Sequence, residues 1–131
     1  MKKIFSTAIA CVMASLGISC QEEAGFRSVS VEEFARVMAD TSVVVLDVRT
    51  ADEHNAGHIE GTTLHIDVLK PDFDSLAVAN IKKGSTVALY CRSGNRSKRA
   101  SAQLAAKGYK VIELATGYNG WVEATRSKDG E

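Results

Sequence analysis

The residues best suited to chemistry lie in one short stretch, LYCRSGNRS, where an apolar run leads into Cys91. Arg92 and Arg96 follow the cysteine closely, Gly94 permits a sharp turn, and a helix is predicted to start near Ser97. Backbone amides in such a turn, the helix N-terminus and the two arginines all favour a thiolate over a thiol. The pattern therefore predicts a nucleophilic cysteine that attracts small anions.

The elements that would position this cysteine alternate between strands and helices. Apolar, β-branched runs predict strands at residues 26–29, 42–48, 62–67, 86–90 and 110–114. Helical spacing and end signals predict helices at residues 31–38, 69–81, 97–107 and 120–127. This alternation predicts an α/β sandwich with a mainly parallel sheet and helices on both faces. Ligands of such folds bind beyond the carboxyl ends of the strands, where Cys91 and Asp47 both stand.

The first 20 residues read as a targeting segment rather than as part of the fold. Lys2 and Lys3 precede a mostly apolar run of about 15 residues, whereas a membrane-spanning helix needs about 20. Small residues then lead to Cys20, which resembles a bacterial lipoprotein signal except that Leu16 stands one position too far from the cysteine. We expect residues 1–20 to be a signal peptide with Cys20 as its lipidation site, and ordinary secretory cleavage is the alternative.

Residues 21–25 would then form a short tether before a domain spanning residues 26–131. The protein would be exported, and either periplasmic or anchored to a bacterial membrane by its lipid. Of the three cysteines, only Cys91 would remain in the folded domain, because Cys11 lies in the signal core and Cys20 at its end. An unpaired cysteine in an exported protein suggests a reactive thiol, and a buried, inert cysteine at a strand end is the alternative.

Length and charge bound the remaining possibilities. The 131 residues suggest one compact domain, and 16 basic and 16 acidic residues cancel to a net charge of +0. Global charge therefore gives no sign of a nucleic-acid partner, and we expect a monomer that binds none.

Three segments in the same order resemble the rhodanese-type sulfurtransferases. The cysteine loop matches the C-x-x-G-x-R segment of that family. Residues 47–66, DVRTADEHNAGHIEGTTLHI, are similar to its D-V-R…G-H-I segment, and residues 108–121, GYKVIELATGYNGW, to its closing segment. His54 departs from a usual aromatic residue, and Thr116 replaces the first glycine of the closing pair. The resemblance implies a three-layer rhodanese-like α/β/α sandwich whose mainly parallel sheet has about five strands.

The resemblance also implies an enzyme, a thiosulfate sulfurtransferase that moves a sulfane sulfur through a persulfide on Cys91. Its substrates would be a small anionic donor and a thiol or cyanide acceptor, and it would need neither a metal nor an organic cofactor. The persulfide would be held by the loop residues, which are Arg92, Ser93, Gly94, Asn95, Arg96 and Ser97. Arg92 and Arg96 would steer the anionic donor, and Arg96 would also hold the loop.

Two other functions stay open. The related phosphatases and arsenate reductases use C-x5-R loops that wrap a tetrahedral anion, whereas Cys91 and Arg96 are spaced as C-x4-R. That shorter spacing resembles the sulfurtransferase form, so we rank phosphatase or arsenate reductase activity lower. The other alternative is a module that carries its persulfide to a protein partner.

Several polar residues have two interpretations. Asp47 and Arg49 either line the pocket or pair with each other, and Glu53 is expected to make a structural hydrogen bond or ion pair. The roles of Lys98 and Arg99 are left open by the sequence.

Two histidines are spaced as metal ligands on a helix would be. His54 and His58 lie four residues apart, but Gly57 interrupts any helix between them. We therefore expect no metal site.

Overall fold

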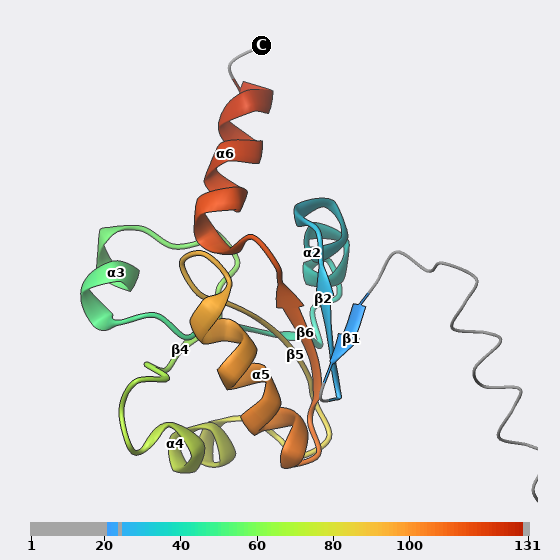
Figure 1. Cartoon of the computed structure of the whole chain (residues 1–131), viewed down its shortest axis with the longest axis vertical. Coiled ribbons are helices and arrows are strands. Elements are labelled where there is room, and N and C mark those ends of the chain that lie inside the picture. The colour runs from blue at the N-terminus through green and yellow to red at the C-terminus, as the bar shows by residue number, and fades with distance from the viewer. Residues whose placement is uncertain (1–20, 24, 130–131) are drawn as a thin grey trace, which may run out of the picture.

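The computed structural model describes residues 21–23 and 25–129, and its centre is a six-stranded sheet (Figure 1). The strands are β1 (Gln21–Glu23), β2 (Phe26–Val29), β3 (Val44–Asp47), β4 (Leu64–His65), β5 (Thr86–Tyr90) and β6 (Lys110–Leu114). Their order is β1-β2-β6-β5-β3-β4, and all neighbouring strands are parallel except β1 and β2. The predicted α/β fold with a mainly parallel sheet is therefore confirmed.

Helices cover both faces of this sheet. Parallel strands must be joined by crossover connections, and these connections lie on one face or the other. The helices are α2 (Val31–Met38), α3 (Ala51–Ala56), α4 (Phe73–Asn80), α5 (Asn95–Ala106) and α6 (Gly117–Asp129). In Figure 1, α4 and α5 lie on one side of the sheet, while α2 and the start of α6 lie on the other. The three-layer arrangement predicted from the sequence is thus present.

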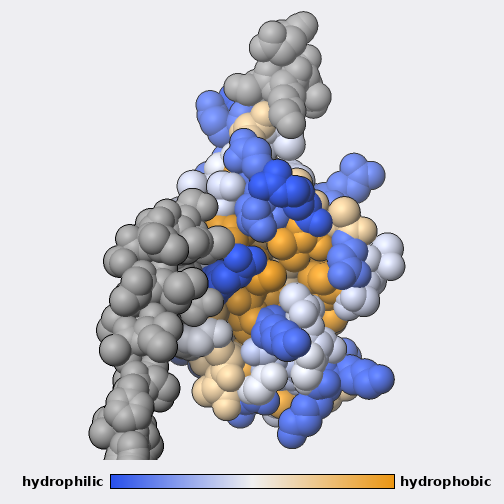
Figure 2. Space-filling view, turned by 90° about the vertical axis from the view of Figure 1, so that its right-hand side faces the viewer, coloured by the Kyte–Doolittle hydropathy of each residue, from blue (hydrophilic) through white to orange (hydrophobic). Residues whose placement is uncertain are grey.

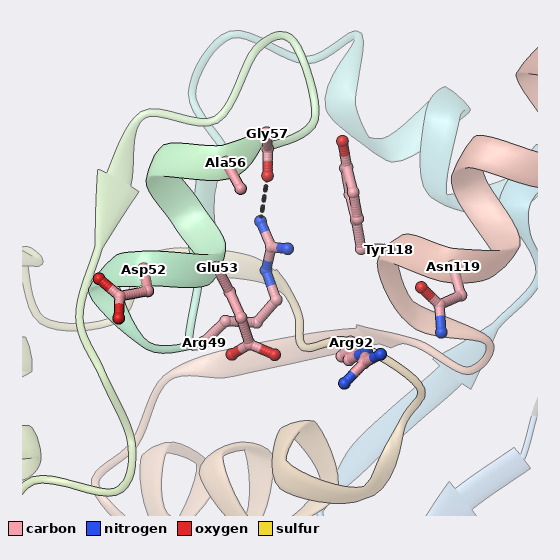
Figure 3. Close-up of a pocket in the computed structure, with 8 residues that line it drawn as sticks. All are labelled: Arg49, Asp52, Glu53, Ala56, Gly57, Arg92, Tyr118 and Asn119. Atoms are coloured by element: carbon pink, nitrogen blue, oxygen red, sulfur yellow. Dashed lines mark hydrogen bonds between the residues drawn. The ribbon is translucent and has the colours of Figure 1, made fainter.

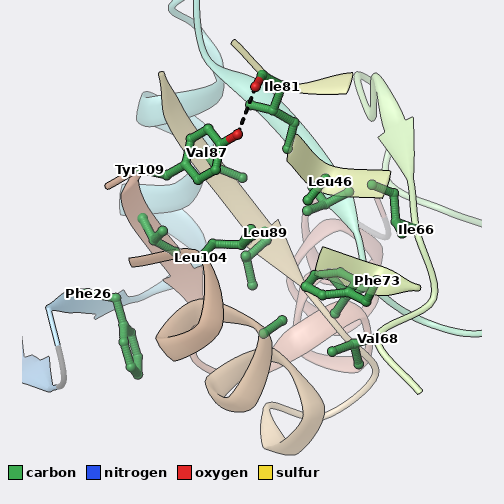
Figure 4. Close-up of a cluster of buried hydrophobic side chains, with 14 of the residues drawn as sticks. Phe26, Leu46, Ile66, Val68, Phe73, Ile81, Val87, Leu89, Leu104 and Tyr109 are labelled. Carbon is green, nitrogen blue, oxygen red and sulfur yellow. Dashed lines mark hydrogen bonds between the residues drawn. The ribbon is translucent and has the colours of Figure 1, made fainter. Parts of the chain in front are cut away.

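The core is divided between the two faces by the alternation of side chains along each strand. On one face, Val87 and Leu89 of β5 pack in a cluster with Phe73 of α4 and Leu104 of α5 (Figure 4). Cys91 is the next residue in this alternation and belongs to the same cluster. The strand therefore delivers the cysteine side chain to the α5 face of the sheet.

On the opposite face, Ala88 and Tyr90 of β5 pack with Phe34 of α2. The ring of Phe34 meets the rings of Tyr90 and Trp121 edge to face, at centroid distances of 6.4 and 6.3 Å. Since Trp121 lies in α6, this aromatic contact ties the last helix to the sheet beside the cysteine loop.

Local structure differs from the sequence prediction in several places. The expected tether contains β1, because the outer edge of β2 offers unpaired backbone groups that Gln21–Glu23 satisfy. The helix predicted from Leu69 begins at Phe73, after turns in which Lys70 and Phe73 donate backbone hydrogen bonds to Asp67 and Lys70. Helix α3 was not predicted. The strand predicted at residues 62–67 is limited to β4, and α5 and α6 begin at residues 95 and 117 rather than at 97 and 120.

Two predictions concern residues that the structure does not describe. The signal peptide and the lipidation of Cys20 fall on residues 1–20, outside the described ranges. Within those ranges, no helix is both long and apolar enough to span a bilayer.

Candidate active site

The loop after β5 turns its backbone around the Cys91 sulfur. Gly94 adopts a positive φ of 109°, and its amide donates a hydrogen bond to Cys91 Sγ at 3.1 Å. A Cβ at Gly94 would lie 2.4 Å from the Ala115 carbonyl oxygen, which is closer than side-chain carbons approach backbone. Glycine is therefore required here both by the left-handed backbone and by the approach of the neighbouring segment.

The start of α6 holds this loop from the other side. The amide of Tyr118 donates to the Cys91 carbonyl at 2.8 Å, and that of Asn119 donates to the Arg92 carbonyl at 3.0 Å. The approach is so close that a Cβ at Gly117 would lie 2.5 Å from the Arg92 carbonyl oxygen. The closing segment of the family resemblance thus positions the cysteine loop through its backbone.

Gly120 leaves room for Thr116, which stands where the rhodanese-type pattern has a glycine. A Cβ at Gly120 would lie 2.0 Å from Thr116 Oγ1, so the two side chains could not occupy this space together. Because Gly120 leaves the space free, Thr116 fits beside the turn and Gly117 keeps its contact with the cysteine loop.

The surroundings of Cys91 favour its thiolate. The residue is 1% exposed, and its Sγ lies 3.4 Å from Ser97 Oγ. Burial raises the pKa of the Cys91 thiol, but hydrogen bonding with the Ser97 hydroxyl and with the amides of Ser97, Gly94 and Ser93 outweighs it. The pKa therefore lies below its ordinary value, as a nucleophilic cysteine requires.

Arg96 is held by an ion pair with Glu53. Its guanidinium donates to both carboxylate oxygens at 2.8 and 2.9 Å, a bidentate pairing. Glu53 also closes a capping box with Thr50, which explains why α3 begins there. The structure thus shows the expected ion pair of Glu53, and Arg96 fastens the cysteine loop to α3 with its charge compensated.

This ion pair predicts a pH-dependent stability. Hydrogen bonding to Arg96 lowers the pKa of Glu53 from 4.5 to about 2. The contribution of Glu53 is therefore present above about pH 4.5 and lost as the pH falls toward 2. Glu53→Gln keeps an acceptor for Thr50 and should lower the Tm by about 2–4 °C at neutral pH, with the deficit shrinking in acid.

Thermal unfolding followed by circular dichroism at several pH values measures this difference. Asp52→Asn is the matched control, because Asp52 is an exposed carboxylate in the same helix with no ion pair among the described residues. A deficit for Glu53→Gln that stays constant from pH 7 to about 2 would contradict the prediction.

Asp47 and Arg49 form a second, fully buried ion pair. The Nε and Nη2 atoms of Arg49 donate to the two oxygens of Asp47 at 2.9 and 2.7 Å. Burial opposes ionisation of Asp47, but hydrogen bonds from Arg49 and His54 outweigh it and lower the pKa of Asp47. Arg49 also donates to the Gly57 carbonyl at 2.7 Å and lies over the Tyr118 ring. Arg49 therefore pairs with Asp47 and also lines the cavity, whereas Asp47 is not among the residues that line it.

A cavity of about 430 Å³ opens beside the cysteine loop (Figure 3). Figure 3 shows the Arg49 side chain between α3 and the Tyr118 ring, with Arg92 on the cysteine loop and Asn119 on α6. Arg49 and Arg96 are engaged by carboxylates, whereas Arg92 has no ion pair among the described residues. Of the two arginines that line the cavity in the described part of the chain, Arg92 is therefore the one without a carboxylate partner.

The three histidines stack on one another near this pair. The His54 ring lies 4.0 Å from that of His58 and 4.4 Å from that of His65, and its Nδ1 is 2.9 Å from Asp47 Oδ2. Within the described part of the chain, no group of three or more histidine, cysteine, aspartate or glutamate side chains is arranged to hold a metal ion.

Glu113 is a buried acid that the sequence analysis missed. It is 0% exposed in β6 and accepts hydrogen bonds from the hydroxyls of Ser97, at 2.5 Å, and Ser28. Lys98, whose role the sequence left open, pairs with Glu113 at 3.3 Å, while Arg99 is exposed. The available signal was an acidic residue between the apolar Ile112 and Leu114 of the strand KVIEL, because a buried charge needs partners.

Comparison with known proteins identifies the class to which this fold and loop belong. The family model described as "Rhodanese-like domain" matches residues 30–124, so the chain belongs to the rhodanese-like family. The solved human single-domain sulfurtransferase TSTD1 is 28% identical, with a TM-score of 0.61 over 73% of this chain and 95% of that one. A Bacillus halodurans protein, BH2092, shares the fold at 21% identity, with a TM-score of 0.66 over 91% of this chain and 81% of that one.

Curated relatives include proteins with several functions. The thiosulfate sulfurtransferase GlpE of Tolumonas auensis is 29% identical over 73% of this chain and 88% of its own length. The protein HIGH ARSENIC CONTENT 1 of Arabidopsis thaliana is 35% identical over 60% of this chain and 52% of its own length. A tRNA uridine(34) hydroxylase of Leptospira interrogans is 33% identical over 70% of this chain but only 25% of its own length. The chain thus spans about half or less of the last two relatives.

Proposed function

We propose that the protein is a thiosulfate sulfurtransferase that works through a persulfide on Cys91. The observation that carries the proposal is the loop itself, in which the Gly94 amide contacts Cys91 Sγ at 3.1 Å and the pKa of the thiol is lowered. The likeness to the sulfurtransferases GlpE and TSTD1 supports it.

The reaction would proceed by double displacement. The Cys91 thiolate attacks the outer sulfur of thiosulfate, and sulfite leaves with the electron pair of the broken S–S bond. The persulfide then carries its charge on the outer sulfur, where the loop amides stabilise it. Cyanide or a thiolate attacks that sulfur, leaves as thiocyanate or a new persulfide, and returns the Cys91 thiolate.

The arginines would have separate roles in this reaction. Arg92 borders the cavity with no ion pair among the described residues, so it would attract the anionic donor. Arg96 would act by position, because its pair with Glu53 fixes the loop against α3.

The mass of the intact protein after incubation with thiosulfate tests the proposal. We expect a gain of one sulfur atom, located on the peptide that contains Cys91 and removed by cyanide. Absence of that gain in reduced, folded protein would sink the proposal.

Arsenate reduction is the second candidate, because one relative is named for high arsenic content. Arsenite production from arsenate in the presence of a thiol reductant, without any sulfur gain from thiosulfate, would favour it. A stable persulfide with poor turnover to small acceptors would instead favour a carrier that delivers sulfur to a protein partner.

We also propose that the protein is an exported monomer whose signal segment is cleaved before Cys20, which is then lipidated. The motivation is the charged start, the apolar run and Cys20 in the sequence. The mass of the natural N-terminal peptide tests this, since lipidated Cys20 would be the first mature residue.

A further inference from the structure

Glu113 is joined to Cys91 by a single side chain. Ser97 Oγ lies 3.4 Å from Cys91 Sγ and donates its hydrogen bond to Glu113 Oε2 at 2.5 Å. Glu113 itself is 0% exposed and lies opposite Ser28 in the pairing of β6 with β2. A buried carboxylate is costly, and sheet packing alone would be met by an apolar residue at this position.

Glu113 and the Cys91 sulfur compete for the single proton of the Ser97 hydroxyl. The Ser97 hydroxyl has one proton and can donate it to one acceptor at a time. While it donates to Glu113, its oxygen can only accept from the Cys91 thiol, and the distances of 2.5 Å to Glu113 Oε2 and 3.4 Å to Cys91 Sγ fit that arrangement. A Cys91 thiolate needs that proton instead, so forming the thiolate takes a hydrogen bond away from Glu113.

We propose that Glu113 is a positioning residue that, through Ser97, opposes the ionisation of Cys91 that the loop amides favour, and so sets the pH at which the nucleophile is released. No bond is made or broken between Glu113 and the substrate. When the thiol proton leaves to solvent, Ser97 turns its proton from Glu113 to Sγ. The inference rests on the proposed function only in taking Cys91 as the reacting cysteine.

The other charged groups near Cys91 are not linked to its sulfur through the Ser97 hydroxyl. Arg96 of α5 interacts electrostatically with Cys91, but its charge is compensated by Glu53 of α3, and Asp67 after β4 also acts on Arg96. Lys98 of α5 is directed to Glu113, 3.3 Å from Oε2, and to the Gly94 carbonyl. Among these groups only Glu113 shares a hydrogen-bonding hydroxyl with the sulfur.

The titration of Cys91 in the full chain tests the proposal. The rate of iodoacetamide alkylation is measured against pH on the peptide that contains Cys91, which separates it from Cys11 and Cys20. The ultraviolet absorbance of the thiolate, taken as the difference from the Cys91→Ser counterpart, gives the same midpoint without requiring access to the sulfur.

Glu113→Gln should lower the midpoint of the Cys91 titration by about one pH unit. The change removes a carboxylate, and a neutral amide is a weaker acceptor for the Ser97 hydroxyl. Alkylation well below both midpoints should then be about tenfold faster. A midpoint that stays unchanged or rises would overturn the proposal. If Glu113→Gln does not fold, Glu113→Asp draws the carboxylate away from Ser97 and should lower the midpoint in the same direction.

Two further variants show whether the effect passes through Ser97. Ser97→Ala should raise the midpoint, and Glu113→Gln added to it should produce a much smaller fall than in the wild type. An equal fall in both backgrounds would mean that Glu113 acts directly, and would overturn the role of Ser97.

Ser28→Ala is the matched control. Its hydroxyl donates to the same carboxylate but does not contact Cys91. It should not lower the midpoint, and a fall as large as that of Glu113→Gln would assign the effect to loosened packing.

These measurements contain no sulfur donor, so they are independent of persulfide formation. If the wild type gains no sulfur while the midpoints move as expected, the proposed function fails and the role of Glu113 stands.

Discussion

Replacing Cys91 by serine should lower thiosulfate:cyanide sulfur transfer by at least about a thousandfold, to the level of the uncatalysed background. A serine hydroxyl ionises far less readily than a thiol and cannot hold a transferable sulfur. The loss should appear as the absence both of thiocyanate production and of the one-sulfur mass gain.

Two comparisons make this result specific. Cys20→Ser and Cys11→Ser should both keep the mass gain, because only Cys91 lies in the loop that follows β5. The circular dichroism spectrum of Cys91→Ser should match that of the wild type, since the change is nearly isosteric. Sulfur transfer that survives in a folded Cys91→Ser protein would rule out the persulfide mechanism.

Gly94→Ala should destabilise the protein and remove sulfur transfer even below its unfolding temperature. The new Cβ would lie 2.4 Å from the Ala115 carbonyl oxygen, so the cysteine loop and the turn before α6 must separate. That movement displaces the Gly94 amide from its 3.1 Å contact with Cys91 Sγ. We expect a loss of about 1–3 kcal/mol beyond the cost of the left-handed backbone itself.

Gly108→Ala provides the matched control for this experiment. Gly108 has a similar φ of 97°, compared with 109° at Gly94, but a Cβ there meets no atom within 4 Å. It should lose about 1–2 kcal/mol from backbone strain and keep full sulfur transfer. Urea unfolding gives the stabilities, and equal losses for the two variants would show that the close approach to Ala115 is unimportant.

Local sequence signals are enough to predict the strand that leads to the cysteine and the turn that follows it. Residues 86–90 and 110–114 form strands with the predicted bounds, because runs of buried β-branched residues are a local signal. The glycine at position 94 and the cap at Ser30 are likewise encoded within a few residues. Fold class followed from the alternation of such elements.

The ion pairs around the cysteine loop depend on how distant segments come together in the fold. Arg96 was expected to steer the donor and to hold the loop, and the fold pairs it with Glu53 from α3, while Lys98 pairs with Glu113 from β6. Residue spacing cannot reveal these pairs, because they form only once the sheet order brings separate segments together. The same holds for β1, which needs the free edge of β2 to become a strand. Whether a charged side chain forms an ion pair, binds a substrate or acts on the cysteine depends on the residues that it contacts in the folded protein.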